Sequence, residues 1–182
     1  MAKIAILIED QYEDIELWYP YYRLREEGME TVLVGTGKDE YKSKHGYPGK
    51  PVLSIKNAKV DDFDGVVIPG GYAPDLLRRH KEVIDFVRNM YNEEKLVAAI
   101  CHAGWVLASA GILRGKNATG FFSIKDDMVN AGAKYLDKEV VVDGNIITSR
   151  KPDDMPFFCK EIINFLKGSA VRVPEAVGAM SR

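Results

Sequence analysis

The segment from Lys95 to Gly111 constrains the fold more than any other part of the chain. Its first half, Leu96–Ile100, is a short apolar run, typical of a strand buried on both faces of a parallel sheet. Small and apolar residues then favour a helix over His102–Ala110, and the closing glycine is a typical helix stop. The polar pair Cys101-His102 is therefore predicted to lie at a sharp turn between strand and helix, which lifts a nucleophile toward a cleft.

Cys101 is the candidate nucleophile of this turn. Because a helix N-terminus stabilises negative charge, we expect the pKa of its thiol to be depressed. Such turn residues carry backbone strain, so we also expect a positive φ at Cys101. The competing interpretation is an inert core cysteine, since cysteine is often buried, but the adjacent His102 favours a functional thiol. Cys159 lies on an apolar helical stripe and is expected to be core, without a depressed pKa.

Strand and helix patterns alternate along the chain, and Thr36–Ile55 is predicted to be a hairpin or an extended excursion. The predicted strands are Lys3–Ile8, Glu30–Val34, Val66–Ile68, Leu96–Ile100, a strand end at Asn117–Phe121, and the hairpin strands Glu139–Val142 and Asn145–Thr148 around Asp143-Gly144. The predicted helices are Glu13–Glu27, one helix carrying Leu76, Val83, Val87 and Met90, His102–Ala110, Ile124–Asn130, and a last helix with an apolar stripe from Met155 to Leu166 that Gly168 ends.

This alternation predicts an α/β fold with a doubly wound, mostly parallel sheet sandwiched by helices. In such sheets, ligands bind beyond the carboxyl ends of the strands. Three polar loops leave strands at that edge, at Glu9–Asp14, Pro69–Asp75 and Cys101-His102, so we expect them to form a single site. The pair Gly70-Gly71 is not a dinucleotide fingerprint, because the chain lacks both G-x-G-x-x-G and an acidic ribose partner.

Composition limits the classes of function. A length of 182 residues suits one domain, and a net charge of −2 gives no reason to expect nucleic acid or a membrane surface as a partner. Two distant cysteines make no disulfide framework and suit a reducing cytoplasm, where we expect the protein. Since Met1 leads almost directly into a strand, no signal peptide is expected, and no apolar run is long enough to span a membrane.

The residues of the three loops allow carbonyl chemistry. A cysteine thiolate attacks a carbonyl carbon, and backbone N–H groups of the Gly70-Gly71 turn and of His102 are placed to stabilise the resulting oxyanion. Glu13, Asp14 and Asp75 are acidic residues of the neighbouring loops. One carboxylate could orient His102, and another could be buried, protonated and hydrogen-bonded to the sulfur. The alternative is that Glu13 and Asp14 are merely charged first-turn residues of a helix.

Four ordered motifs resemble those of the PfpI intracellular protease family, a branch of the ThiJ/PfpI, class I glutamine-amidotransferase-like superfamily. They are EDIELWYP at Glu13–Pro20, PGGYAP at Pro69–Pro74, AICH at Ala99–His102 and IKDDMVNAG at Ile124–Gly132. The resemblance extends from Lys3 to about Lys167. It implies a single flavodoxin-like domain over residues 1–168, followed by a C-terminal tail over residues 169–182.

The resemblance also implies roles for individual residues. Cys101 would be the nucleophile, Glu13 the carboxyl that contacts its sulfur, His102 the adjacent base, and Gly71 an oxyanion-hole donor. Asp75 would reach the histidine of a neighbouring subunit in a homo-oligomer, as a dimer or a hexamer of dimers. No metal or organic cofactor is expected.

The implied activities are hydrolysis of small peptides, or glyoxalase and deglycase action on methylglyoxal or its adducts. The sequence leaves the choice of substrate open. It departs from the family where Asp75 replaces a glutamate, Tyr72 an arginine and Phe121 a tyrosine; with Gly70, these last two are expected to line the pocket. Ala103-Gly104-Trp105 also replaces the usual Gly-Pro. The alternative function is a redox-sensing or chaperone-like protein that uses an oxidisable Cys101.

Overall fold

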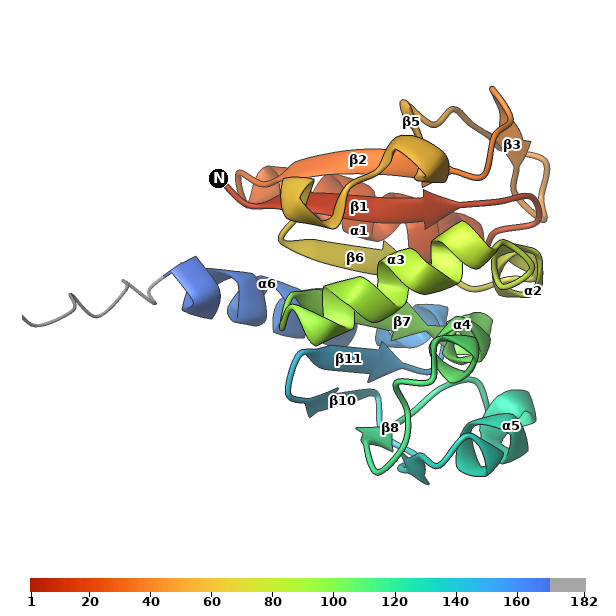
Figure 1. The fold of residues 1–182 in the computed structure, drawn as a ribbon, viewed down its shortest axis with the longest axis vertical. Helices are drawn as coiled ribbons and strands as arrows, with labels where there is room; N and C mark the ends of the chain where they lie inside the picture. The colour runs from red at the N-terminus through yellow and green to blue at the C-terminus, as the bar shows by residue number, and fades with distance from the viewer. Residues whose placement is uncertain (171–182) are drawn as a thin grey trace, which may run out of the picture.

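One seven-stranded sheet forms the centre of the computed structural model, which describes residues 1–170 (Figure 1). The strand order is β10-β11-β7-β6-β1-β2-β5, and every neighbouring pair is parallel except β10 with β11. The strands are β1 (Lys3–Ile8), β2 (Glu30–Gly35), β5 (Leu53–Ser54), β6 (Gly65–Ile68), β7 (Leu96–Ile100), β10 (Val140–Asp143) and β11 (Ile146–Ser149). The predicted α/β class and mostly parallel sheet are therefore confirmed.

Alternate residues of the central strands pack into two separate hydrophobic cores, one on each face of the sheet. From β1, Ala5 and Leu7 enter one core, while Ile4, Ile6 and Ile8 enter the other. All five residues of β7 are buried, as its apolar run predicts. A strand with both faces covered stays almost entirely apolar because neither face meets water.

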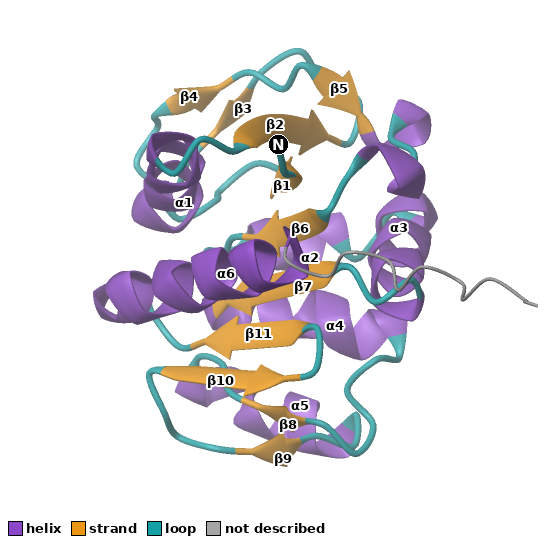
Figure 2. Ribbon diagram, turned by 90° about the vertical axis from the view of Figure 1, so that its left-hand side faces the viewer, coloured by secondary structure: helices purple, strands orange, loops and turns teal. Residues whose placement is uncertain are grey.

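Helices cover both faces of the sheet, as Figure 2 shows. The helices α1 (Asp14–Glu26) and α6 (Met155–Ala170) pack on one face, where Leu17, Leu24 and Phe158 join the core. The helices α3 (Lys81–Asn92) and α4 (Gly104–Ala110) pack on the other face, with α2 (Ala73–Leu77) and α5 (Lys125–Asn130) nearby. Cys159 is 1% exposed and belongs to the core beside α1, as predicted.

Two small sheets lie outside the central one. In the 36–55 segment, β3 (Tyr41–Lys42) pairs with β4 (Pro48–Gly49) in an antiparallel hairpin, as predicted. The end of the same segment forms β5, which pairs with β2 at the edge of the main sheet. The predicted strand end at Asn117–Phe121 is shorter: β8 (Asn117–Ala118) pairs with β9 (Lys134–Tyr135).

The structure corrects two helix predictions. The helix predicted to carry both Leu76 and Met90 is two helices, because His80 adopts an extended backbone and becomes the N-cap of α3. Gly168 does not end the last helix, which continues to Ala170. The rest of the predicted tail, residues 171–182, lies outside the described residues.

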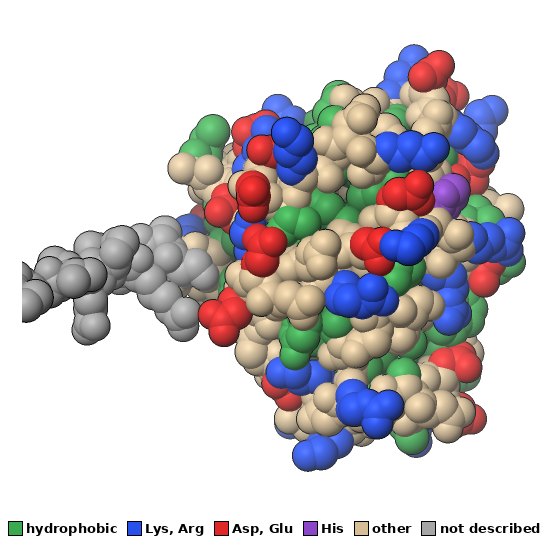
Figure 3. Space-filling view, viewed as in Figure 1, with side chains coloured by type: hydrophobic (Ala, Val, Ile, Leu, Met, Phe, Trp, Pro, Cys, Tyr) green, Lys and Arg blue, Asp and Glu red, His purple; other side chains and the backbone are tan. Residues whose placement is uncertain are grey.

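The surface carries both signs of charge. On the face seen in Figure 3, acidic and basic side chains are interspersed rather than gathered into a field of one sign. Across residues 1–170, none of the helices has the length and apolar character needed to cross a membrane.

Candidate active site

Cys101 lies at the carboxyl end of β7, in a 3₁₀ turn over Cys101–Ala103 that leads into α4. Its φ is 59°, in the left-handed region that non-glycine residues rarely adopt, which confirms the predicted strain. The side chain is nearly covered, with 8% of the residue exposed. The strained turn therefore places the Cys101 side chain at the edge of the sheet where the parallel strands end.

The three predicted loops meet around this sulfur. Tyr12 forms a bridge with Gly71, and the Glu13 N–H donates to the Gly70 carbonyl at 3.2 Å. A Cβ on Gly70 would lie 2.6 Å from the Cys101 Cβ, and a Cβ on Gly71 would lie 2.6 Å from the Glu13 nitrogen. Only glycine lets the chains approach this closely, and Gly71 also has a φ of 76°.

Two backbone N–H groups point at the sulfur. Those of Gly71 and His102 both hydrogen-bond to Cys101 and favour its charged form. The Gly70 N–H is not available in the same way, because it donates to Glu16 Oε2 at 2.8 Å. The geometry thus brings together the two expected oxyanion donors, Gly71 and His102, and assigns Gly70 to holding a carboxyl group.

The carboxyl that interacts with the Cys101 thiol belongs to Glu16, which corrects the expectation that Glu13 contacts the sulfur. Glu16 is fully buried, and burial raises the pKa of its carboxyl to about 8, although the Gly70 N–H opposes this. Its Oε1 has no hydrogen-bond partner of good geometry among the described residues. The carboxyl is therefore mainly protonated at neutral pH.

Helical periodicity in the EDIELWYP motif is the signal that could have identified Glu16. The buried residues of α1 are Glu16, Leu17, Pro20 and Leu24, so Glu16 shares a face with apolar residues four and eight positions along. A carboxyl on the buried face of a helix, at the sheet edge where the strands end, is a stronger indication of a residue that contacts the sulfur than a carboxyl that only precedes the helix.

Glu13 instead forms an ion pair with Lys44, which comes from the turn between β3 and β4. This pairing raises the pKa of Lys44, whose charge also acts on Glu16 and Cys101. Neighbouring His45 pairs with Asp14 at 2.7 Å. Ligand atoms of Glu13, Asp14 and His45 lie within 4.8 Å of one another, the one such metal-compatible group among residues 1–170, but each carboxylate already has a cationic or histidine partner.

His102 faces the sulfur through one ring nitrogen. Its Nδ1 lies 3.2 Å from Cys101 Sγ, and its Nε2 lies 3.2 Å from the Ser123 hydroxyl. Phe121 stacks on the imidazole at 4.9 Å between ring centroids, and the Trp105 ring approaches edge-on at 5.1 Å. Burial and then the Lys44 charge lower the pKa of His102, which is therefore neutral at neutral pH and able to accept a proton.

Asp75 does not reach His102 within the chain. Its carboxylate forms an ion pair with Arg79. Although burial works against this, hydrogen bonds from Arg79 and Tyr72 hold the pKa of Asp75 below its usual range. Tyr72 is 46% exposed and lies beside Arg79 rather than against the sulfur, whereas Phe121 covers the imidazole. A cavity of about 250 Å³ borders Phe121 on the side that Arg150 lines.

The expected depression of the Cys101 pKa is wrong for this state of the protein. Burial, then the Glu16 charge, raises the pKa of the thiol to about 12, and burial also raises that of Cys159 to about 12. The helix that follows is only seven residues long and begins after a 3₁₀ turn, so its dipole offsets little of this cost. What distinguishes Cys101 is its set of partners, because a base and two N–H donors surround it.

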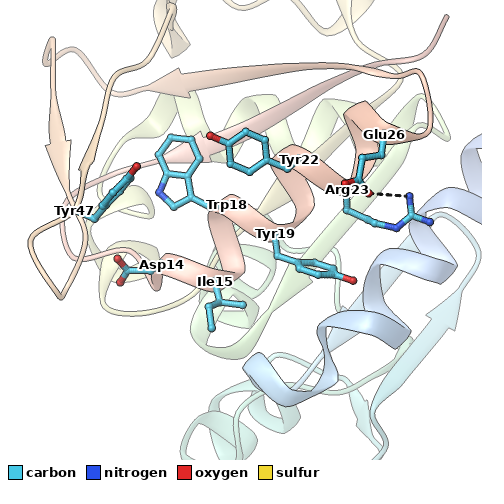
Figure 4. A pocket seen from close by; sticks show the side chains of 8 residues that line it. All are labelled: Asp14, Ile15, Trp18, Tyr19, Tyr22, Arg23, Glu26 and Tyr47. Carbon is cyan, nitrogen blue, oxygen red and sulfur yellow. Dashed lines mark ion pairs between the residues drawn. The ribbon is translucent and has the colours of Figure 1, made fainter.

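A larger groove, of about 760 Å³, lies on the outer face of α1 (Figure 4). Four aromatic side chains line this groove: Trp18, Tyr19 and Tyr22 project from α1, and Tyr47 comes from the neighbouring loop before β4, as Figure 4 shows. The buried face of the same helix carries Glu16, so the groove and the thiol lie on different sides of α1.

Comparison with known proteins gives one consistent result. The model of the DJ-1/PfpI family matches residues 2–165. The chain is 43% identical over 165 residues to "Deglycase PfpI" of Pyrococcus furiosus, covering 91% of this chain and 99% of that one. It is 44% identical over 167 residues to "Putative cysteine protease YraA" of Bacillus subtilis, covering 91% and 98%.

A solved structure has the same fold. The chain is similar, with a TM-score of 0.90 and 43% identity, to a two-domain protein of Anabaena variabilis that contains DJ-1/ThiJ/PfpI-like and ferritin-like domains. The match covers 98% of this chain and 52% of that one, so this chain spans about half of the two-domain protein.

Proposed function

The chain belongs to the DJ-1/PfpI family, and from that premise we propose that it is a cofactor-independent cysteine enzyme in which the Cys101 sulfur attacks a carbonyl carbon. Relatives named as a deglycase and as a cysteine protease support an enzyme of this family. The observation that carries the proposal is the strained Cys101, whose sulfur has His102 Nδ1 at 3.2 Å and two backbone N–H groups directed at it.

The first step is the same for either substrate class. The thiol proton moves to the unprotonated Nδ1 of His102, and the sulfur electron pair forms a C–S bond to the carbonyl carbon. The carbonyl π pair moves to oxygen, where the Gly71 and His102 N–H groups stabilise it, at roughly 3 kcal/mol per donor in known cases. Because the thiol pKa is about 12, attack depends on this local proton transfer rather than on a standing thiolate.

Glu16 keeps the site from accumulating negative charge. A neutral carboxyl beside the sulfur is compatible with a thiolate, whereas a carboxylate there raises the thiol pKa. With a pKa of about 8, Glu16 is mainly neutral at pH 7. The proposed enzyme therefore works best where His102 is unprotonated and Glu16 is still protonated.

We propose small carbonyl compounds, methylglyoxal or its adducts, ahead of small peptides as substrates. The sulfur is 8% exposed and Phe121 covers the neighbouring imidazole, which suits a compact ligand better than a folded protein. The test is a methylglyoxal-depletion assay beside a peptide-hydrolysis assay, with Cys101→Ala as the inactive variant and Cys159→Ala as the matched control. Turnover beyond one equivalent that depends on Cys101 supports an enzyme; a single oxidation event with no turnover supports the redox-sensing alternative.

The proposal includes a homo-oligomer in a reducing cytoplasm, where free thiols persist. The exposed aromatic groove of α1 supports an oligomer, because contiguous exposed apolar surface is typical of an interface. The oligomer is also proposed to bring Asp75 of one chain, released from its ion pair with Arg79, to His102 of a neighbouring chain, through a contact separate from the α1 groove. Mixing Cys101→Ala with Asp75→Ala protein should restore part of the activity; mixtures that stay inactive despite proven subunit exchange would remove this role from Asp75.

A further inference from the structure

The His102 ring is held by contacts from its own chain. Phe121 stacks on one face with an interplanar angle of 28°, and Trp105 packs against it at an angle of 62°. Trp105 is itself fixed, since its Nε1 donates to Asp127 at 2.8 Å. These contacts set the plane of the ring but not which nitrogen carries the proton.

Within residues 1–170, the polar contact of the ring besides Cys101 is the Ser123 hydroxyl, 3.2 Å from Nε2. Ser123 belongs to the 3₁₀ turn Phe122–Ile124, which follows Phe121 directly. The same short segment therefore supplies both the aromatic stack and the hydroxyl. The charged group that acts on His102 is Lys44, and the titratable group that it faces is Cys101.

The ring nitrogen that carries the hydrogen determines the direction of this hydrogen bond. If Nδ1 is to take the thiol proton it must carry a lone pair, so in the neutral ring the hydrogen is on Nε2. That N–H can only donate, and the Ser123 oxygen is the acceptor at hydrogen-bonding distance. After proton transfer the ring is an imidazolium with two N–H groups, one on the thiolate and one on Ser123.

We propose that Ser123 is a positioning residue, whose hydroxyl accepts the Nε2–H of His102 and holds Nδ1 unprotonated toward Cys101. This inference rests on the proposed function, in which His102 is the base. It gives His102 an orienting partner in its own chain, the role that a carboxylate fills in a Ser-His-Asp triad. The serine O–H stays free to donate to a carboxylate of a neighbouring chain, so it is compatible with a role for Asp75.

The test follows the reactivity of Cys101 itself and needs no substrate. The rate of iodoacetamide alkylation at Cys101, measured by peptide mass spectrometry from pH 5 to 10, reports thiolate formation whether or not the protein turns over any compound. Ser123→Ala should slow alkylation of Cys101 about fivefold near neutral pH, the rate factor that corresponds to losing one typical hydrogen bond. It should also shift the plot of alkylation rate against pH to higher pH. Ser123→Thr should restore the rate, and Ser109→Ala, which loses only a contact to Arg78, should match the unmodified protein.

A second measurement observes the tautomer directly. The chain has three histidines, so ¹⁵N-histidine spectra can be assigned by single substitutions at His45 and His80. We expect the Nε2–H form of His102 in the unmodified protein and in Ser123→Thr, and a mixture of tautomers in Ser123→Ala. An unchanged tautomer and an unchanged alkylation profile in Ser123→Ala would overturn the proposal. If the unmodified protein turns over neither methylglyoxal nor peptide, while the tautomer and the alkylation rate respond to Ser123→Ala as expected, the result counts against the proposed function and not against the role of Ser123.

Discussion

Replacing Glu16 by glutamine should stabilise the protein, and increasingly so as the pH rises. Burial raises the pKa of this carboxyl from 4.5 to about 8. Between these two values the folded protein retains a proton that the unfolded chain has released, so the carboxyl costs stability as the pH rises from 4.5 to 8. Glu16→Gln removes that cost while keeping an oxygen that can accept the Gly70 N–H.

The magnitude follows from the two pKa values. Each pH unit corresponds to about 1.4 kcal/mol, so the 2.5 units between pH 4.5 and pH 7 amount to about 3.5 kcal/mol, and the cost levels off at about 5 kcal/mol above pH 8. The pKa of the Cys101 thiol, about 12, lies outside this range and adds no slope. In Glu16→Gln the side-chain NH2 would take the place of Oε1, which has no hydrogen-bond partner among the described residues. The cost of burying that NH2 is the same at every pH, so the diagnostic quantity is the slope of the stability difference against pH.

Urea denaturation at a series of pH values measures this slope. From pH 5 to pH 8 the free energy of unfolding of Glu16→Gln should gain about 3.5 kcal/mol relative to the unmodified protein. Glu13→Gln is the matched control, because it makes the same exchange one helical turn away, at a carboxylate that pairs with Lys44 instead of being buried beside the thiol. A stability difference that stays constant with pH would refute the assignment of a buried, protonated carboxyl to Glu16.

Three further predictions concern the thiol and its glycine turn. Gly70→Ala should abolish Cys101-dependent turnover, since its Cβ would lie 2.6 Å from the Cys101 Cβ; methylglyoxal depletion at the rate of the unmodified protein would contradict this. Limited alkylation near neutral pH should label Cys101 before Cys159, because only Cys101 has a base at 3.2 Å; peptide mapping that finds Cys159 first would contradict this. Methylglyoxal should be consumed faster than casein is cleaved, and robust Cys101-dependent casein cleavage without methylglyoxal consumption would reverse the proposed order of substrates.

The sheet and the meeting of the three loops could be predicted because they depend on local pattern. The uninterrupted apolar run of β7 requires burial on both faces, and parallel strands bring their carboxyl ends to one edge. The turn at Cys101 follows from a strand that ends directly at a helix. No equivalent local signal marked the break before α3, because Leu77 and Val83 are both buried and the apolar pattern continues across it.

The partners of the sulfur could not be fully predicted, because they depend on helix rotation and on long-range contacts. Glu13 and Glu16 are one turn apart, and only the packed orientation of α1 decides which of them faces Cys101. Lys44 reaches the site from the separate β3–β4 hairpin, and Ser123 from a turn beyond α4. The expected lowering of the Cys101 thiol pKa is wrong for a similar reason. Burial of the thiolate costs more free energy than the N-terminus of a short helix returns.

The most direct test of the central claim is the turnover of Cys101→Ser, which places an oxygen where the attacking sulfur stands and leaves the backbone turn unchanged. Its steady-state rate with methylglyoxal and with a small peptide should fall to that of the uncatalysed reaction, while Cys159→Ser, with the same exchange in the core, keeps its activity. Full turnover by Cys101→Ser would contradict attack by the Cys101 sulfur.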